Sequence, residues 1–305
     1  MKLVPRTTLI GAEITQVRLL MHMMKLPLTL AFALMIAARV QSQPIRVMTF
    51  NIRFATAPDG DNIWPLRREL LLKVIRDFDP DVLGVQEAQR IQVDQLANAF
   101  PEYNHVGVGR EPDGGGEYSA IFFRRERFDL CDAATQWLSD TPLEAGSRSW
   151  GNNLPRIYTL ARLLDRRTQR RFIVMNTHWD HESQPARLHS GKMMAEHLAE
   201  AHLGFHEPTV VMGDFNAAPD NPAIGALTKG GKLTDTLLAA RPEEKELSTF
   251  NGFGAAQTSP KIDAIFVDDG WKVEDAAIVR TNDNGRFPSD HFPVTATVTL
   301  KSEQK

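Results

Sequence analysis

The sequence predicts an α/β fold in which two β-sheets pack face to face with helices outside them. Helix and strand patterns alternate between residues 45 and 100, strand patterns dominate from 103 to 164, and the alternation returns after 172. Alternating units place helices on a sheet, whereas consecutive strands extend one. The sequence from 43 to 305 contains no repeat of fixed period and no linker rich in Pro, Gly and Ser, so we expect one domain there.

The first alternating segment contains two strands and two helices. Ile45–Phe50 alternates like a half-buried strand. Pro65–Phe78 repeats apolar residues at helical spacing and has its proline near the start, where a helix tolerates it. Val82–Val85 reads as a short buried strand, and Val93–Phe100 as the next helix.

The middle of the chain consists of strands and long connections. We expect strands at Ala120–Phe123, Phe128–Leu138 and Ile157–Leu164. A glycine turn at 114–116 and the segment 141–155 are the connections, and long connections beside a site often carry function or recognition.

The last part returns to strands with helices between them. Phe172–Met175 and Thr209–Met212 are apolar runs of strand length. Helical patterns follow both, from about Gln184 to Leu203 and from about Asp220. Three further strands are expected, at Ile262–Val267, Trp271–Val279 and Phe292–Leu300.

Residues 1–42 have the features of a signal peptide. Lys25 precedes an apolar stretch at 26–38 that is too short for a bilayer core of about 30 Å, and Ser42 is a small residue where cleavage could fall. We therefore expect a secreted or periplasmic protein without stable membrane insertion after cleavage.

The start of that segment leaves alternatives open. Met23 or Met24 sits where such a peptide should begin, so the residues before them need not be translated. An N-terminal anchor helix that stays in place is the alternative to cleavage. The mature catalytic domain would in either case occupy 43–305.

Charge and cysteine content narrow the function classes. Residues 1–42 hold five Lys/Arg and one Asp/Glu, so residues 43–305 carry 30 basic and 37 acidic side chains, a formal net charge of −7. Proteins that grip long nucleic acid are usually basic, which argues against a general nuclease. Cys131 is the single cysteine, so no intramolecular disulfide can form, and we expect it to be a small buried side chain.

Six of the strand-like segments are followed or begun by chemically competent side chains. Splitting a phosphate ester requires a cation against the phosphoryl oxygens, a water oriented for in-line attack, and neutralisation of developing negative charge. Carboxylates, amides and imidazoles can divide these tasks. The six positions are Asn51, Glu87, His178, Asp214, Asp263 and His291.

Glu87 is the strongest candidate for a metal ligand. A carboxylate is an oxygen ligand for Mg²⁺, which proteins typically hold through one or two carboxylates together with water and substrate. Asn51, one strand away, offers a carbonyl oxygen to the same ion or to its water. Taken singly, Glu87 could equally be a helix N-terminal carboxylate and Asn51 a loop hydrogen-bonding residue.

Asp214 and Asn216 are candidates for handling the attacking water. They are two apart on an extended stretch, so both side chains can face one side. Asp214 could take a proton from water, and Asn216 could orient that water or a phosphate oxygen. A lone Asp at a strand end is more often a turn former or a helix cap.

Two histidines supply hydrogen-bond donors. His291 could donate to a non-bridging oxygen, with Asp263 or Asp290 fixing its tautomer and keeping it charged. His178 could supply a second donor from the opposite sheet, although by itself it could equally be a satisfied interior imidazole. His178-x-Asp180-His181 also has the look of a zinc cluster, but a dinuclear zinc hydrolase would need several more bridging histidines.

These residues lie in motifs that resemble the endonuclease/exonuclease/phosphatase superfamily, in its order. The resemblance covers about residues 45–300, and ordered motifs of this number are highly specific. It implies a DNase I-like four-layered α/β-sandwich with two mixed β-sheets, dependence on Mg²⁺ or Mn²⁺, and hydrolysis of phosphodiesters or phosphomonoesters. The motifs are Thr49-Phe50-Asn51-Ile52-Arg53, Gln86-Glu87-Ala88, Asn176-Thr177-His178, Gly213-Asp214-Phe215-Asn216, Ile262-Asp263-Ala264-Ile265-Phe266 and Ser289-Asp290-His291-Phe292-Pro293-Val294.

The resemblance implies a metal site and a phosphate contact. Asn51 and Glu87 would hold the ion, with Asp290 contributing directly or through water. His178 would contact the scissile phosphate. Nucleases of the abasic-site repair branch carry an acidic residue where this chain has Arg53 and a tyrosine where it has His178, which argues against a DNA-repair substrate.

It also implies the roles of the remaining motif residues. Asp214 would be the base or would orient the water, and Asn216 would position nucleophile and phosphate. His291, paired with Asp263, would stabilise the transition state.

A closer similarity is to an exported bacterial subgroup of this family. Its marks are Gly116-Glu117-Tyr118-Ser119-Ala120-Ile121-Phe122, Pro155-Arg156 and Asn176-Thr177-His178-Trp179-Asp180-His181. Arg156 would bind phosphate as a bidentate donor, the alternative being an exposed arginine at a strand start. We expect Glu117, Asp180, His181 and Arg187 to shape substrate choice.

The sequence therefore favours an exported, Mg²⁺- or Mn²⁺-dependent phosphoesterase acting on a small or lipid-linked phosphate ester. A secreted Mg²⁺-dependent nuclease is the alternative, so a nucleic-acid substrate stays open. A binding module that kept the fold and lost the chemistry is a third hypothesis. We expect a monomer.

Overall fold

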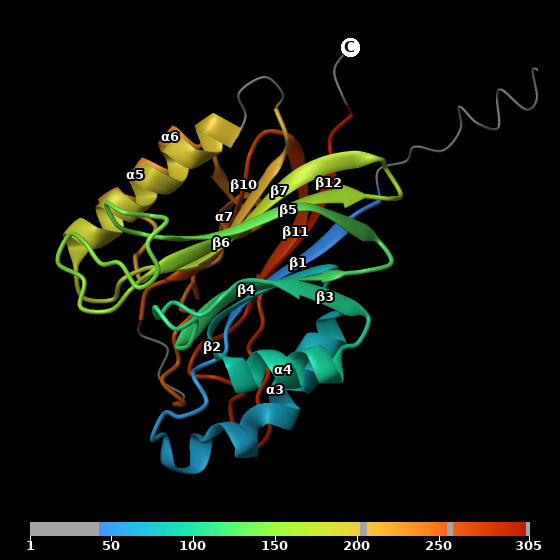
Figure 1. Cartoon of the computed structure of the whole chain (residues 1–305). Coiled ribbons are helices and arrows are strands. Elements are labelled where there is room, and N and C mark those ends of the chain that lie inside the picture. Colours follow the sequence, from blue (N-terminus) through green and yellow to red (C-terminus); the bar gives the residue numbers. More distant parts are fainter. Residues whose placement is uncertain (1–42, 202–205, 255–258, 303–305) are drawn as a thin grey trace, which may run out of the picture. The chain divides into compact units, whose positions relative to one another are not determined.

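Two six-stranded β-sheets form the centre of the fold (Figure 1). The structure is a computed structural model that describes residues 43–201, 206–254 and 259–302. The first sheet has the strand order β11-β12-β1-β2-β4-β3 and the second the order β5-β6-β7-β8-β10-β9. The strands are β1 (Ile45–Asn51), β2 (Val82–Gln89), β3 (Tyr103–Val106), β4 (Glu117–Arg124), β5 (Phe128–Trp137), β6 (Ile157–Asp165), β7 (Arg170–His178), β8 (Thr209–Asp214), β9 (Thr234–Asp235), β10 (Asp263–Val267), β11 (Trp271–Ile278) and β12 (Val294–Leu300).

Helices lie on the outer faces of both sheets. Figure 1 shows α3 and α4 beside the first sheet and α5 and α6 beside the second. The helices are η1 (Gly60–Asn62, one 3₁₀ turn), α3 (Trp64–Phe78), α4 (Arg90–Ala99), α5 (Gln184–Ala201), α6 (Pro222–Gly230) and α7 (Thr236–Ala240). The predicted four-layered α/β-sandwich is confirmed.

Side-chain alternation along the strands separates the hydrophobic layers. Val47 of β1 packs with Phe172 of β7 in a core built from both sheets, while the next residue, Met48, packs with side chains of α3 and α4. In β7 the neighbour of Phe172, Ile173, turns to the layer shared with α5 and α6. Successive strand residues point to opposite faces, so each central strand is apolar on both sides.

The parallel strand pairs determine where the site lies. β1 runs parallel to β2, and β7 runs parallel to β8, whereas the other pairs are antiparallel. His178 and Asp214 are therefore register partners at the carboxyl ends of β7 and β8. Asp263, at the start of antiparallel β10, pairs with Asp214. Asn51 is correspondingly the register partner of Gln86, one residue before Glu87.

Gly213 permits the close approach of β7 and β8 next to Asp214. A Cβ at Gly213 would lie 2.1 Å from the carbonyl oxygen of Thr177, and the residue has φ of +152°. Only glycine tolerates both conditions. The glycine of this motif thus serves the register that places Asp214.

Several short elements were not predicted from the sequence. β3 lacks an alternating apolar pattern because it is a four-residue strand at a sheet edge with two exposed side chains. β9, of two residues, and α7, of five, pack beside β10. The closing strand begins at Val294, two residues later than expected, after Pro293. The end of the helix predicted to reach Leu203, like the predicted signal peptide, lies outside the described residues.

The prediction that Cys131 is buried is wrong. The side chain is exposed. β5 is an edge strand whose pairing with β6 shifts between Leu130 and Asp132, so Cys131 sits in the irregularity. The bulge and the missing neighbour strand remove the packing that an inner strand would provide.

None of the helices in the described part of the chain is long and apolar enough to cross a bilayer.

Candidate active site

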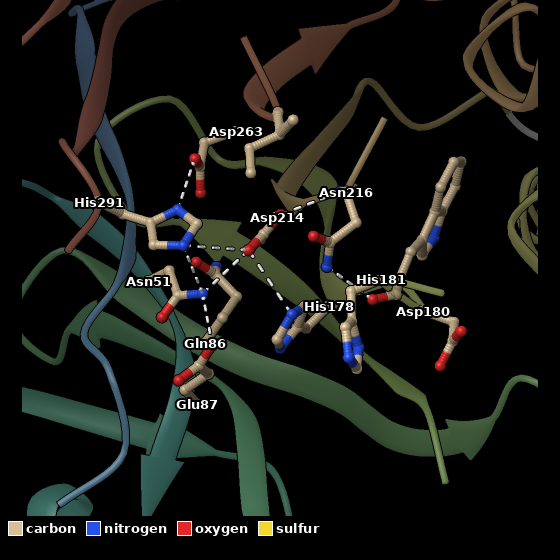
Figure 2. A network of polar contacts seen from close by, with 12 residues as sticks. Asn51, Gln86, Glu87, His178, Asp180, His181, Asp214, Asn216, Asp263 and His291 are labelled. Atoms are coloured by element: carbon tan, nitrogen blue, oxygen red, sulfur yellow. Dashed lines mark hydrogen bonds and ion pairs between the residues drawn. The ribbon is translucent and has the colours of Figure 1, made fainter. Parts of the chain in front are cut away.

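The side chains predicted at the strand ends meet in one polar network (Figure 2). The amide nitrogen Nδ2 of Asn51 lies 3.0 Å from Glu87 Oε1, 2.9 Å from Asp214 Oδ2 and 3.5 Å from His291 Nε2. Asn51 Oδ1 accepts a hydrogen bond from the backbone nitrogen of Arg53 at 3.0 Å. The network thus joins a strand of the first sheet to a strand of the second.

His291 lies between two acids from the second sheet. Its Nδ1 is 2.9 Å from Asp263 Oδ2, and its Nε2 is 3.8 Å from Asp214 Oδ2. Burial alone would lower the pKa of His291, but Asp263 and Asp214 outweigh burial and raise that pKa well above its usual range. An imidazolium held in this way can donate from Nε2 to an oxygen that gains negative charge.

The neighbouring backbone holds His291 and Asp290 in place. Thr249 Oγ1 accepts hydrogen bonds from the backbone nitrogens of Ile262 and Asp263, and the Thr249 carbonyl accepts one from Phe292. The backbone nitrogen of Asn251 donates to the Asp290 carbonyl at 2.7 Å. Residues 249–251 therefore position this part of the network.

Asp214 is a carboxyl that releases its proton less readily than an ordinary aspartic acid. Burial, followed by repulsion from Asp263, raises its pKa to about 7. A carboxyl that titrates near neutrality suits proton transfer from water. Asn216 lies beside it, because its backbone nitrogen donates to Asp214 Oδ1 at 2.9 Å and its side-chain nitrogen donates to the Trp179 carbonyl at 3.0 Å.

Two of the site residues have strained backbone conformations that orient their side chains. Glu87 has φ of +60° within β2, where pairing with β4 is interrupted between Val85 and Ala88, and Asn216 has φ of +47°. Left-handed conformations are uncommon for residues other than glycine and concentrate at functional sites. The irregularity in β2 turns Glu87 away from the regular pleat and towards the network.

Glu87, Asp290 and Arg53 form the side of the site that suits a divalent cation. Arg53 Nη1 is 4.0 Å from Glu87 Oε2, and Arg53 Nε is 3.6 Å from Asp290 Oδ2. Both carboxyl groups are buried, and burial together with the nearby Glu87 raises the pKa of Asp290, although His291 opposes this. Two buried carboxylates with an amide beside them match the oxygen-rich ligand set of Mg²⁺ or Mn²⁺.

A second acid and imidazole cluster consists of Asp214, Asp263 and His291, whose potential ligand atoms lie within 4.8 Å of one another. Within it, His291 Nδ1 pairs with Asp263 Oδ2, while the Asp214 oxygens accept hydrogen bonds from Asn51 and Asn216. Within the described ranges, Asp180 and His181 belong to no cluster of three potential ligands, so the zinc arrangement of His178, Asp180 and His181 does not form there.

A cavity of about 370 Å³ opens beside this network. The predicted site residues that line it are Glu87, Glu117, Arg156, His178, His181, Asp214, Asn216, Asp290 and His291. Its apolar rim is formed by Phe54, Leu154, Ile262 and Phe250, and the Phe250 ring packs edge to face on His291 at 5.1 Å. A cavity with convergent polar groups and an apolar rim fits a small ligand.

Arg156 and His178 share one wall of the cavity. Arg156 is buried, so the alternative of an exposed strand-start arginine is wrong. Its Nε is 3.3 Å from Asp180 Oδ2, and its Nη2 is 2.8 Å from His181 Nδ1. Burial, reinforced by Arg156, lowers the pKa of His178 well below its usual range, so this imidazole is neutral.

Two predicted substrate-binding residues have other contacts. Asp180 accepts hydrogen bonds from the backbone nitrogens of Glu182 and Ser183 at the start of α5, and Arg187 binds the Asp180 carbonyl and Gln184 Oε1. Neither residue is among those that line the cavity. In this structure Asp180 therefore orients Arg156, and Arg187 supports the turn before α5.

Sequence reasoning missed three polar residues that organise the site. Asn176, in a recognised motif but without an assigned role, donates from Nδ2 to the carbonyls of Val85 and Ala120 and thereby ties the two sheets together. Arg67 and Arg110 were not singled out, because an arginine in a helical or loop pattern usually lies at the surface. Both are buried.

Comparisons with known proteins agree with this geometry. A model of the "Endonuclease/Exonuclease/phosphatase family" matches residues 48–291. The crystal structure of an endonuclease/exonuclease/phosphatase from Bacteroides vulgatus is 31% identical, has a TM-score of 0.79, and covers 85% of this chain and 100% of that one. The mannosyl-6-phosphatase of Bacteroides thetaiotaomicron is 30% identical, has a TM-score of 0.76, and covers 83% of this chain and 99% of that one.

Two more distant relatives are longer than this chain, and one of them is named as an exoribonuclease subunit. Human Nocturnin is 26% identical over 198 residues, which are 58% of this chain and 44% of Nocturnin. The CCR4-Not complex 3'-5'-exoribonuclease subunit Ccr4 of Emericella nidulans is 22% identical over 240 residues, 60% of this chain and 35% of that protein. The chain thus spans less than half the length of these two relatives. The family match over most of the chain, the solved structures and the ordered motifs together establish that this chain belongs to the endonuclease/exonuclease/phosphatase family.

Proposed function

We propose that this chain is a divalent-metal-dependent phosphoesterase that hydrolyses phosphate esters of small molecules. One observation carries the proposal: Asn51 joins Glu87, Asp214 and His291 in a single network beside the cavity. This network combines cation ligands, a carboxyl that titrates near neutrality and a charged imidazole. The similarity of the chain to a family named for nucleases and phosphatases, and to a mannosyl-6-phosphatase, supports the same reaction class.

The chain's own groups account for the steps of hydrolysis. Glu87 and Asp290, with Asn51 beside them, would hold Mg²⁺ or Mn²⁺, which when bound supplies positive charge to the phosphoryl oxygens. Asp214 accepts a proton from the attacking water, which Asn216 helps to orient. The water oxygen forms the new P–O bond, the ester P–O bond breaks, and the departing alkoxide takes a proton from solvent.

Two imidazoles stabilise the transition state. His291, kept protonated by Asp263, donates from Nε2 to a non-bridging oxygen. His178 contacts the phosphoryl group from the second sheet, and Arg156 adds a guanidinium on the same wall.

The small-substrate proposal rests on charge and on the cavity. Residues 43–305 carry a formal net charge of −7, and a cavity of about 370 Å³ is of the size that suits a small ligand. The similarity to a mannosyl-6-phosphatase makes sugar phosphates the first compounds to assay. A lipid-linked phosphate ester would place its apolar part on the rim.

A nuclease is the second candidate, and Phe250 is the observation that favours it. The side chain is 38% exposed at the rim of the cavity, where a base could stack on it. Degradation of an oligonucleotide in Mg²⁺ at a rate above that for small esters would favour this alternative.

The decisive experiment measures phosphate release from a panel of esters with and without Mg²⁺. Monoesters, diesters, single-stranded DNA and RNA should be compared, using Asp214→Ala, His291→Ala and, as a control distant from the cavity, Glu207→Gln. We expect metal-dependent turnover that both site variants abolish and the control keeps. Turnover retained in both site variants would refute the assignment of the site, and no turnover by the wild type would favour a binding module.

We also propose export of a monomer through cleavage near Ser42. The apolar stretch at 26–38 supports export. N-terminal sequencing of the protein recovered from the periplasm or medium of an expressing bacterium tests cleavage, and light scattering tests the monomer. Retention of the intact chain in the membrane fraction would contradict cleavage.

A further inference from the structure

The wall of the cavity that carries Arg156 contains a second buried arginine, Arg110. Arg110 donates from Nη1 and Nη2 to the two carboxylate oxygens of Glu117, at 2.7 and 2.9 Å. Both residues line the cavity, and neither contributes to the metal side of the site. The proposed chemistry leaves this pair without a role.

The loop between the two residues holds them in a fixed arrangement. The backbone nitrogen of Arg110 donates to the Glu117 carbonyl, and Trp137 Nε1 donates to the Arg110 carbonyl at 2.7 Å. A Cβ at Gly109 would lie 2.0 Å from the carbonyl oxygen of Gly115, so the loop closes only on glycine. The glycine turn at 114–116 thus brings an arginine and a carboxylate together at the cavity.

Buried nitrogens on this wall have no hydrogen-bond partner among the described residues. They are Arg110 Nε, Arg156 Nη1 and His178 Nδ1. The nearest carboxylate oxygens are too far for a hydrogen bond, with Glu111 Oε1 3.8 Å from Arg110 Nε and Glu117 Oε2 3.9 Å from His178 Nδ1. Unpaired buried polar nitrogens are costly, and each one in a folded protein calls for an explanation such as a bound ligand.

A small hollow of about 10 Å³ adjoins these residues. Arg110, Glu117, Arg156 and His178 all line it, as they line the larger cavity. A space of this size holds about one oxygen atom with its hydrogen. The hollow therefore admits a single hydroxyl projecting from a molecule in the cavity.

The charges on this wall favour a neutral group. The guanidinium of Arg110 pairs with the carboxylate of Glu117, and the guanidinium of Arg156 pairs with the carboxylate of Asp180. Each positive charge on this wall is therefore balanced by a negative one. A second phosphate would require unmatched cations, whereas a hydroxyl can accept from an arginine and donate to a carboxylate at once. The apolar rim with Phe250 then faces the carbon-bound hydrogens of the same molecule.

We propose that Arg110 and Glu117 bind a hydroxyl group of a polyhydroxylated, sugar-like alcohol, next to the phosphoryl group that Arg156 and His178 contact, and thereby select the ester that is hydrolysed. This proposal rests on the proposed function, because it assigns the alcohol part of the same substrate. A site built to bind a hydroxyl discriminates strongly against an analogue without it, since its buried polar groups are then left unpaired.

The test compares two phosphate esters of primary alcohols, a hexose 6-phosphate and butyl phosphate, in Mg²⁺. The variants are Arg110→Lys and Glu117→Gln. Arg110→Lys keeps the positive charge and loses the planar guanidinium that makes two parallel hydrogen bonds, and Glu117→Gln keeps the shape of the side chain and loses its charge. Glu207→Gln is the matched control, because Glu207 pairs with Arg162 at 2.6 Å in a similar contact and does not line the cavity. Melting temperature is measured for every variant.

We expect the wild type to prefer the hexose phosphate, and each variant to lose roughly tenfold or more in kcat/KM for it, mainly through KM. The loss for butyl phosphate should be several times smaller. Equal losses for both esters, unchanged kinetics in both variants, or a wild-type preference for butyl phosphate would overturn the proposal. Absence of metal-dependent phosphate release from both esters and from the wider panel would instead refute the proposed function.

A nucleoside 5′-monophosphate distinguishes two sources of hydroxyl groups. A rate above that of the hexose phosphate, sensitive to both variants, would support hydroxyl recognition and assign it to a ribose. A nucleotide rate equal to that of butyl phosphate, with the hexose phosphate preferred, would support recognition of a free sugar.

Discussion

Arg67 joins the two loops that carry the metal side of the site. Its removal should lower both the free energy of unfolding and the catalytic activity. Its Nη1 donates to the carbonyls of Ile52 and Pro288 at 2.6 and 3.1 Å, its Nη2 donates to that of Arg53 at 2.7 Å, and its Nε donates to that of Asn62 at 2.9 Å. The side chain is fully buried. The perturbation is Arg67→Met, which replaces the guanidinium with a long apolar side chain and removes all four hydrogen bonds.

The magnitude follows from two opposing contributions. Burial lowers the pKa of Arg67 to about 10 from 12.5, so keeping the charge costs about 3 kcal/mol. Each hydrogen bond from a charged donor contributes roughly 1.5–3 kcal/mol, and four of them outweigh that cost. Breaking such a buried network typically costs about 3–5 kcal/mol, which for a domain of this size corresponds to a fall in Tm of roughly 10 °C.

The assay combines denaturant unfolding with steady-state kinetics. We expect the loss in stability given above and a fall in kcat/KM of about 10²-fold, because Asn51 and Asp290 adjoin the loops that Arg67 holds. Arg68→Met is the control, since Arg68 pairs with its neighbour Glu69 at the surface, and it should change stability by less than about 0.5 kcal/mol. A free energy of unfolding within about 1 kcal/mol of the wild type would refute the reasoning.

Three further predictions concern the site itself. Asp263→Asn removes the charge that holds His291 protonated, so kcat should fall about 10²–10⁴-fold with little change in Tm, and a near-normal kcat would contradict the pairing. Glu87→Gln and Asp290→Asn should each lower the affinity for Mg²⁺ by about 10–100-fold, measured as the metal concentration that gives half-maximal turnover. An unchanged half-maximal concentration would show that the residue does not bind the metal. Burial lowers the pKa of His178, so folding favours the neutral imidazole. The free energy of unfolding is therefore unaffected by this group above pH 6.5 and falls as the pH drops below that value. Between about pH 7 and about pH 5 the Tm of His178→Gln should therefore fall less steeply than that of the wild type, and parallel curves would speak against this.

The fold could be predicted in outline because it depends on local patterns. The apolar alternation of β1 and the helical spacing of α3 are readable over a few residues, and both elements form within a residue or so of their expected bounds. Polar residues at the ends of β7 and β8 could likewise be recognised as a group. Parallel neighbours must bring such ends to one edge.

Other features could not be predicted, because they depend on which strands become neighbours. The exposure of Cys131 follows from the edge position of β5, which no pattern within β5 reveals. The role of Asn176 requires the second sheet, since its partners are carbonyls of β2 and β4.

The sequence by itself determined the kinds of element, their order, and the chemically competent side chains at their ends, because periodicity and residue chemistry are local properties. Only the tertiary structure decided that Asn51 lies within hydrogen-bond distance of Glu87 and Asp214, and that Arg67 and Arg110 are buried and not exposed. These contacts join residues far apart in the chain. They exist because two sheets, each with its own register, pack face to face and bring their strand ends to the same cavity.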